Sequence, residues 1–188
     1  MIELPPSVLR PYGIIWFRDP ALNLHPGGDE VLVRADGEDE DAFAARQAAH
    51  AAGVAKAADE AFTAYMKAAT EHGDWSALLR AGHQPTIFRV RQIPGSVWDA
   101  IDTWRANRLP SDAEYFALLF RAGVIAIEHA PGGLRVELEE HRDENHNRTG
   151  IGKVLKASVR DELHAIDKRI IPEVAPLIAT QRGGPAGK

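Results

Sequence analysis

Residues 42–69 read AFAARQAAHAAGVAKAADEAFTAYMKAA, and half of these residues are alanine. Alanine has the highest helix propensity of the amino acids, and no proline interrupts the run. A helix is therefore expected over 39–72, with a length of about 45–50 Å at ~1.5 Å per residue. The acidic residues 38–41 stand at its start, where negative charge favours the helix dipole. The alternative is that Gly53 divides the run into two ordinary helices.

The larger apolar residues of this helix fall roughly along one stripe, with alanines between them: Phe43, Val54, Phe62, Tyr65 and Met66. Small residues allow another helix to approach closely. A chain of 188 residues rarely needs a helix of this length for its own core. Part of the helix is therefore expected to project or to pack against another chain.

An arm is expected over residues 1–38, because prolines and glycines punctuate this segment. Within it, Gly13–Phe17 and Glu30–Arg34 are short apolar runs bounded by turn-forming residues, which is typical of strands. Two strands with a long connection are consistent with an arm that lies on a neighbouring subunit, or with a simple edge hairpin.

A compact α+β core is expected over 73–180. Apolar and polar residues alternate over 86–93, as in a half-buried strand. Ser96 with Asp99 and Ser111 with Glu114 have the spacing of residues that cap helix N-termini. Each pair therefore predicts the start of a helix.

The second half of the core is expected to contain a hairpin and a helix. The runs 124–128 and 134–138 flank Pro-Gly-Gly and predict two paired strands. A polar loop is expected over 139–148. Apolar residues at helical spacing then predict a last helix from Gly150 to about Pro172.

The expected architecture is thus a helix-rich α+β fold: one long Ala-rich helix, small antiparallel sheets or hairpins, and a C-terminal helix. The expected organisation has four parts: the arm (1–38), the long helix (39–72), the core (73–180) and a C-terminal tail (181–188).

The composition excludes several classes of function. There is no cysteine, so thiolate catalysis, disulfides and thiolate metal sites are excluded. The net charge is −5 and the basic residues are interleaved with acids, so direct nucleic-acid binding is not expected. Arg89 and Arg91 share one strand face without an aromatic stripe. No apolar run is long enough to span a bilayer, so no membrane insertion is expected.

One cluster of chemically capable residues stands out, namely His141, Asp143, Glu144 and His146. Imidazoles and carboxylates are ligands for zinc or manganese. The two histidines are five residues apart, however, which is not the spacing of a helical ligand pair. A solvated polar loop is the favoured interpretation, so no metal, cofactor or catalytic residue is predicted.

Two other patterns also fall short of a site. No serine lies in a Gly-x-Ser-x-Gly turn. Residues 149–153, Thr-Gly-Ile-Gly-Lys, lack the spacing of a phosphate-binding loop, and their expected role is to begin the final helix.

Residues 85–171 resemble small proteins from the morphogenesis modules of tailed bacteriophages. The features concerned are PTIFRVRQI at 85–93 followed by a helix, then FALLFRAGVIAI at 116–127, then a final helix. Such proteins are tail-assembly or minor virion components. The resemblance implies a role in assembly and no catalytic residues.

The expected function is therefore that of a non-enzymatic structural or assembly protein, a phage virion or morphogenesis component that contacts itself or other virion proteins. Trp16, Phe17 and Trp75 are the candidate interface anchors. The location expected is the virion or host cytoplasm, since residues 1–6 do not resemble a signal peptide. Two alternatives remain: a cytoplasmic adaptor for one protein partner, and a metal-dependent hydrolase using the His141–His146 loop.

Overall fold

The computed structural model describes residues 12–24, 32–71, 73–130, 132 and 134–180. The chain folds as two units. Unit 1 combines Met1–Asp19 with Gln84–Lys188, and unit 2 is the intervening segment Pro20–His83. The fold class is α+β, as predicted, with one long helix and two small antiparallel sheets.

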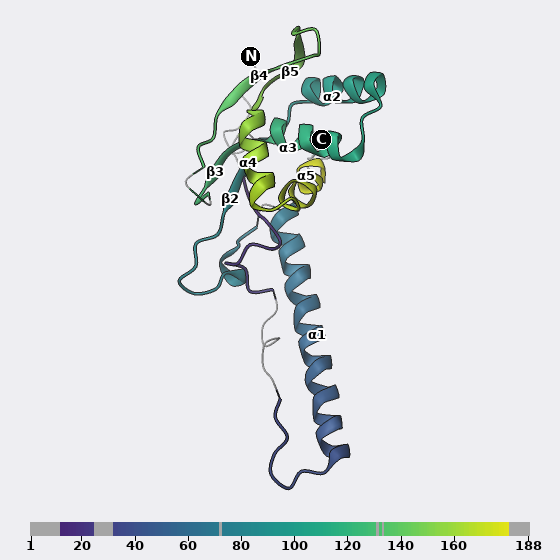
Figure 1. The fold of residues 1–188 in the computed structure, drawn as a ribbon, viewed down its shortest axis with the longest axis vertical. Coiled ribbons are helices and arrows are strands. Elements are labelled where there is room, and N and C mark those ends of the chain that lie inside the picture. Colours follow the sequence, from purple (N-terminus) through teal and green to yellow (C-terminus); the bar gives the residue numbers. More distant parts are fainter. Residues whose placement is uncertain (1–11, 25–31, 72, 131, 133, 181–188) are drawn as a thin grey trace, which may run out of the picture. The chain divides into compact units, whose positions relative to one another are not determined.

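Unit 2 is built on helix α1, Glu40–Thr70, which is drawn in blue in Figure 1. The Asp39 carboxylate caps it by accepting a hydrogen bond from the Ala42 amide at 2.8 Å. Acidic residues occupy the first turn and Lys67 the last, an order that favours the helix dipole. The single long helix is confirmed, and Gly53 does not divide it, because the fourteen alanines of α1, seven on each side, outweigh the local cost of one glycine.

The C-terminal end of α1 is held by the segment that follows it. A short 3-10 helix, η2 (Ser76–Leu78), comes after the turn, and the Trp75 ring lies edge-on to the Tyr65 ring at 5.4 Å. The two ends of unit 2 are also joined, because the Arg80 amide donates to the Ala21 carbonyl at 2.8 Å. The buried side chains of this small core are Ala21, Leu22, Leu24, Tyr65, Ala68, Ala69 and Leu78.

Unit 1 contains a three-stranded antiparallel sheet in the order β1-β2-β3. Strand β1 (Tyr12–Ile15) confirms the strand predicted at Gly13–Phe17, and β2 (Ile87–Val90) confirms the half-buried strand predicted over 86–93. Strand β3 (Val124–Glu128) pairs with the other edge of β2. Segments far apart in the sequence therefore meet in one sheet.

Four helices and a second, two-stranded sheet complete the described part of unit 1. The helices are α2 (Gly95–Arg108), α3 (Asp112–Gly123), α4 (Ala157–Ile166) and α5 (Ile170–Thr180). Phe88 of β2 and Phe120 of α3 meet edge-on at 5.5 Å in the interior. Other fully buried side chains are Ile14, Ile15, Val90, Ile101, Leu119, Val124, Ile151, Leu155, Leu163 and Ile178.

The capping box predicted at Ser111 is confirmed, since its hydroxyl accepts from the Glu114 amide and Glu114 accepts from the Ser111 amide. The predicted cap at Ser96 is wrong. Helix α2 begins at Gly95, and its N-cap is Pro94, which makes no side-chain hydrogen bond.

The predicted hairpin between 124–128 and 134–138 is wrong. Strand β3 pairs with β2, while Leu138 opens strand β4 (Leu138–Arg142), whose partner is β5 (Arg148–Leu155). The expected polar loop over 139–148 is thus half strand, with the turn confined to 143–147.

The predicted last helix is also displaced. Residues 150–155 belong to β5, and the helical part is divided into α4 and α5. Residues 149–153 therefore do not begin a helix. Pro172 does not end the helical region, because it lies in the first turn of α5, where its missing N–H costs nothing.

The predicted strand at Glu30–Arg34 is wrong for residues 32–34, which form no strand, while residues 30 and 31 lie outside the described residues. The tail 181–188 also lies outside them. Among the helices that the structure describes, none is long and apolar enough to cross a membrane.

Candidate functional site

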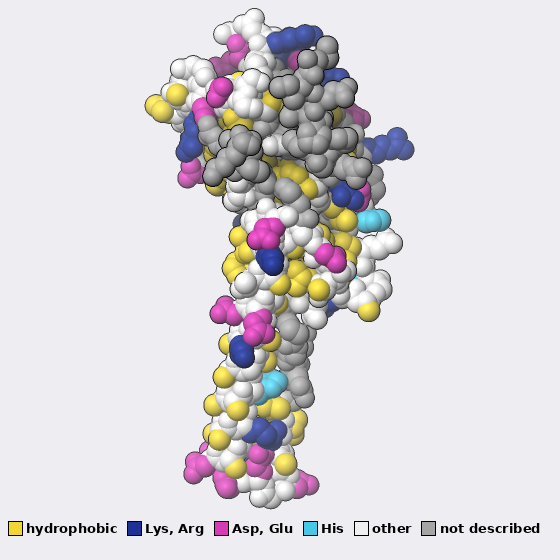
Figure 2. Space-filling model, turned by 180° about the vertical axis from the view of Figure 1, so that it is seen from behind, with side chains coloured by type: hydrophobic (Ala, Val, Ile, Leu, Met, Phe, Trp, Pro, Cys, Tyr) yellow, Lys and Arg dark blue, Asp and Glu magenta, His cyan; other side chains and the backbone are white. Residues whose placement is uncertain are grey.

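The exposed surface of α1 is the first candidate site, because little of this helix is buried. Of its 31 residues, those buried are Tyr65, Ala68 and Ala69, all in the last two turns. The Phe62 side chain retains 46% of its accessible surface. Figure 2 shows hydrophobic side chains spread along this helix with charged ones between them. A helix of this length with so little burial is typical of one that contacts a partner.

A row of small residues spaced four apart runs along α1: Ala45, Ala49, Gly53, Ala57 and Ala61. Gly53 lies at its centre and is exposed, and a Cβ built there meets no atom within 4 Å. Glycine inside a helix costs about 0.5–1 kcal/mol relative to alanine. The contacts of Gly53 within the described chain therefore do not explain why glycine stands there among alanines.

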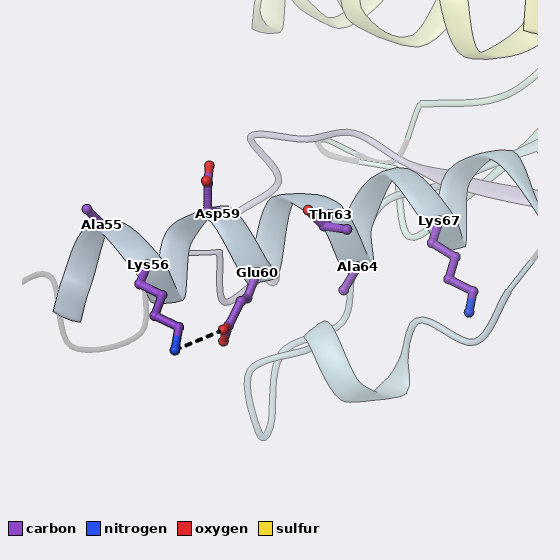
Figure 3. Close-up of a pocket in the computed structure, with 7 residues that line it drawn as sticks. All are labelled: Ala55, Lys56, Asp59, Glu60, Thr63, Ala64 and Lys67. Carbon is purple, nitrogen blue, oxygen red and sulfur yellow. Dashed lines mark ion pairs between the residues drawn. The ribbon is translucent and has the colours of Figure 1, made fainter. Parts of the chain in front are cut away.

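A shallow groove lies on the same helix toward its C-terminal end. In Figure 3 the side chains of Lys56, Glu60 and Lys67 extend to one side, and Asp59 extends to the other. Lys56 and Glu60 form an exposed ion pair at 3.8 Å. An exposed pair of this kind contributes little to stability, so both groups are available to a partner.

The interface anchors predicted from the sequence lie in both units. Trp16, in unit 1, is half-buried, and its indole N–H donates to Glu173 Oε2 at 2.7 Å. Phe17 and Trp75 are half-buried as well. Their role as anchors stays a prediction. The more exposed apolar side chains are Leu109 and Val33, which sequence reasoning missed because isolated apolar residues beside turns give no periodic signal.

The second candidate site is a polar cleft of about 710 Å³ within unit 1. Helices α2, α3 and α4 and the turn between β4 and β5 contribute its walls. The side chains that matter most for its chemistry are Trp104, Arg108, Glu114, Arg121, His141, Asp143, Glu144, Thr149 and Arg160. A cleft of this size suits a small ligand.

His141 lies in β4 and faces this cleft. Its Nδ1 is 2.7 Å from the Thr149 hydroxyl oxygen, which also lies within hydrogen-bonding distance of the His141 carbonyl. Burial lowers the pKa of the His141 imidazole, and the nearby Arg121 charge lowers it further, against an opposing effect of Glu139. Burial and the Arg121 charge thus both favour the neutral form of the imidazole.

The His141–His146 cluster is not gathered around a metal position. His141 is in a strand, whereas His146 lies in the turn with a positive φ of 63°. Asp143 accepts hydrogen bonds from the Asn145 and Asn147 amides, which holds its carboxylate within the turn. Within the described ranges, no three His, Asp or Glu side chains are placed to hold one ion.

Arg121 reaches the cleft from α3 and is the most buried of its charged groups, with 15% of its side chain exposed. Its Nε donates to the Leu155 carbonyl at 2.6 Å, and its Nη2 donates to Glu139 at 2.5 Å. These two contacts fix the guanidinium. Sequence reasoning did not single out Arg121, because its partners are 18 and 34 residues away.

Arg89 of β2 and Arg91, which follows this strand, are both engaged within the chain. Arg89 forms a two-pronged contact with Glu128 at 2.7 and 2.9 Å. Arg91 donates to the carbonyls of Ala122 and Lys153. Both guanidinium groups therefore stabilise unit 1.

The chain matches no family model, no curated protein and no solved structure in the three comparisons with known proteins.

Proposed function

We propose that the protein is a non-enzymatic assembly protein that associates with a second copy of itself through α1. The observation that carries this proposal is the exposure of α1, since most of its side chains are exposed and its buried residues are confined to its last two turns. Burying an exposed apolar face is the main driving force for association. A tailed-phage morphogenesis module is the setting that the sequence resemblance suggests.

The order of residues in α1 supports an antiparallel pair that crosses at Gly53. A two-fold axis through Gly53 would place Ala49 opposite Ala57 and Ala45 opposite Ala61 of the other copy. Rows of side chains four residues apart pack in the commonest class of helix crossing. A glycine at the crossing point lets the two backbones approach, which accounts for glycine at this position.

The charges support the same arrangement. The axis would place Arg46 opposite Glu60 and Asp39 opposite Lys67, so each copy presents opposite charges to the other. Glu38 and the Val33 carbonyl take three of the five N–H donors of Arg46, which leaves two for a second acceptor.

Light scattering of the full chain over a range of concentrations tests this proposal. The expected result is a dimer or larger species whose mass rises with concentration. Gly53→Gln should weaken the association, because its side chain would hold the backbones apart. Ala51→Gln is the matched control, since residue 51 is exposed on the opposite side of the helix. A strict monomer at every concentration would contradict self-association and favour an adaptor that binds a different protein.

A further inference from the structure

The cleft of unit 1 has a basic end that the proposed role of α1 does not use. Arg121 from α3 and Arg160 from α4 both line it, so two helices bring guanidinium groups to one place, beside the His141 imidazole of β4. Burial lowers the pKa of the Arg121 guanidinium, and the nearby Arg160 charge also lowers it, against the opposing effects of Glu139 and Asp161. Like charges brought together in a partly buried cleft favour an anion between them.

The acidic groups of the cleft have partners of their own. Glu114 accepts from the Ser111 amide and hydroxyl, Asp143 from turn amides, and Glu144 pairs with Arg108 at 2.8 Å. The four arginines that line the cleft are Arg108, Arg121, Arg142 and Arg160. Glu139 and Asp161, which are not part of the lining, pair with Arg121 and Arg160.

The basic groups keep hydrogen-bond donors for a ligand. Arg121 has five N–H donors, of which Leu155 and Glu139 take two. Arg160 pairs with its neighbour Asp161, and 35% of its side chain is exposed. The planar donor fork of a guanidinium matches the oxygens of a carboxylate or phosphate.

We propose that this cleft binds a small oxyanion, a carboxylate or a phosphate monoester, between Arg121 and Arg160. Arg121 is the fixed part of the site, because its two protein contacts hold it before the ligand arrives. Arg160 supplies the second guanidinium. Trp104, which also lines the cleft and lies 6.0 Å from the Arg108 guanidinium, offers a flat apolar surface for the organic part of the ligand.

The test is an NMR titration of the full chain with inorganic phosphate and with phenyl phosphate at constant ionic strength. The expected result is a saturable shift of the amides of Thr149, Gly150 and Arg121 with either probe. Arg160→Gln should weaken binding by about tenfold or more, as for the loss of a hydrogen bond to a charged group. Its circular dichroism spectrum shows whether the variant is folded.

Arg148→Gln is the matched control, because Arg148 is exposed on β5 and does not line the cleft. It removes the same charge and should leave the dissociation constant unchanged. Shifts that do not saturate, or equal weakening in both variants, would overturn the proposal, since they indicate only a diffuse charge effect. The titration does not depend on α1. Oxyanion binding can therefore be disproved while self-association through α1 holds, and self-association can be disproved while oxyanion binding holds.

Discussion

Gly123, the last residue of α3, shows how closely two helices of unit 1 approach. A Cβ at this position would lie 2.7 Å from Cγ2 of Ile178, a fully buried residue of α5. Gly123→Ala should therefore destabilise the protein by about 1–3 kcal/mol, the usual cost of overpacking a core. Urea unfolding followed by circular dichroism measures the change.

The control for this prediction is Gly95→Ala. Gly95 is the first residue of α2, and a Cβ there meets no atom within 4 Å. This variant should be unchanged or more stable by about 0.4–1 kcal/mol, because alanine restricts the unfolded chain. Equal destabilisation by both substitutions would contradict the close contact at Gly123.

His141 should make stability depend on pH. Its folded pKa is below the ordinary value of 6.5, owing to burial and to Arg121, with Glu139 opposing and Thr149 bonded to Nδ1. The unfolded chain therefore binds more protons as the pH falls below about 6.5, and the free energy of unfolding should decrease from there down through the folded pKa. Urea unfolding at several pH values should show this slope, and His141→Gln should reduce it. An unchanged slope in the variant would assign the effect to other groups.

At the scale of the element, the helices that could be predicted are those marked by local sequence signals. The alanines of α1 favour a helix whatever surrounds them, and the Ser111–Glu114 box needs only residues three apart. Strand β5 shows where such signals fail. Ile151 and Leu155 are four residues apart, a spacing that fits one face of a helix but also one face of a strand, since it is an even number. Pairing with β4 decides between the two.

The cleft could be predicted only in part for a related reason. His141 was found because it lies in an unusual cluster of chemically capable residues. Arg121 and Arg160 come from helices elsewhere in the sequence, and only the packing of those helices brings them to the same cleft. The false hairpin after β3 has the same cause, because the partner of β3 is the distant strand β2.

Among the helices that the structure describes, α1 should be the least protected when the protein is dilute. Without a partner, residues 44–60 are kept helical mainly by their helix propensity, and a helix held in this way is only marginally stable in water. Hydrogen exchange followed by mass spectrometry should show faster exchange there than in 118–120 of α3, which are buried. Higher protein concentration should slow it. Equal protection of both segments at high dilution would contradict the exposure of α1.

At the scale of the whole molecule, unit 2 is an insertion between two paired strands of unit 1. Asp19 is buried, and its carboxylate accepts a hydrogen bond from the Thr86 amide at 2.9 Å. The two points of unit 1 at which the insertion begins and ends are therefore close together. Replacing residues 20–83 by a short glycine–serine linker should therefore leave unit 1 folded. A dispersed NMR spectrum with the unit 1 shifts retained is the expected result, and an unfolded spectrum would show that unit 1 depends on the insertion.

Because unit 2 is inserted between β1 and β2, it also affects the order in which parts of the chain fold during synthesis. Strand β1 leaves the ribosome long before β2, and a loop of about 70 residues must close before they pair. Unit 2 is complete in the meantime, and its Ala21–Arg80 contact leaves six residues to Ile15 on one side and seven to Ile87 on the other. Shortening the effective loop to about 13 residues reduces the closure entropy by about 1.5 kcal/mol. Folding of unit 2 would thus keep β1 close to the position at which β2 emerges, so that the two strands can pair.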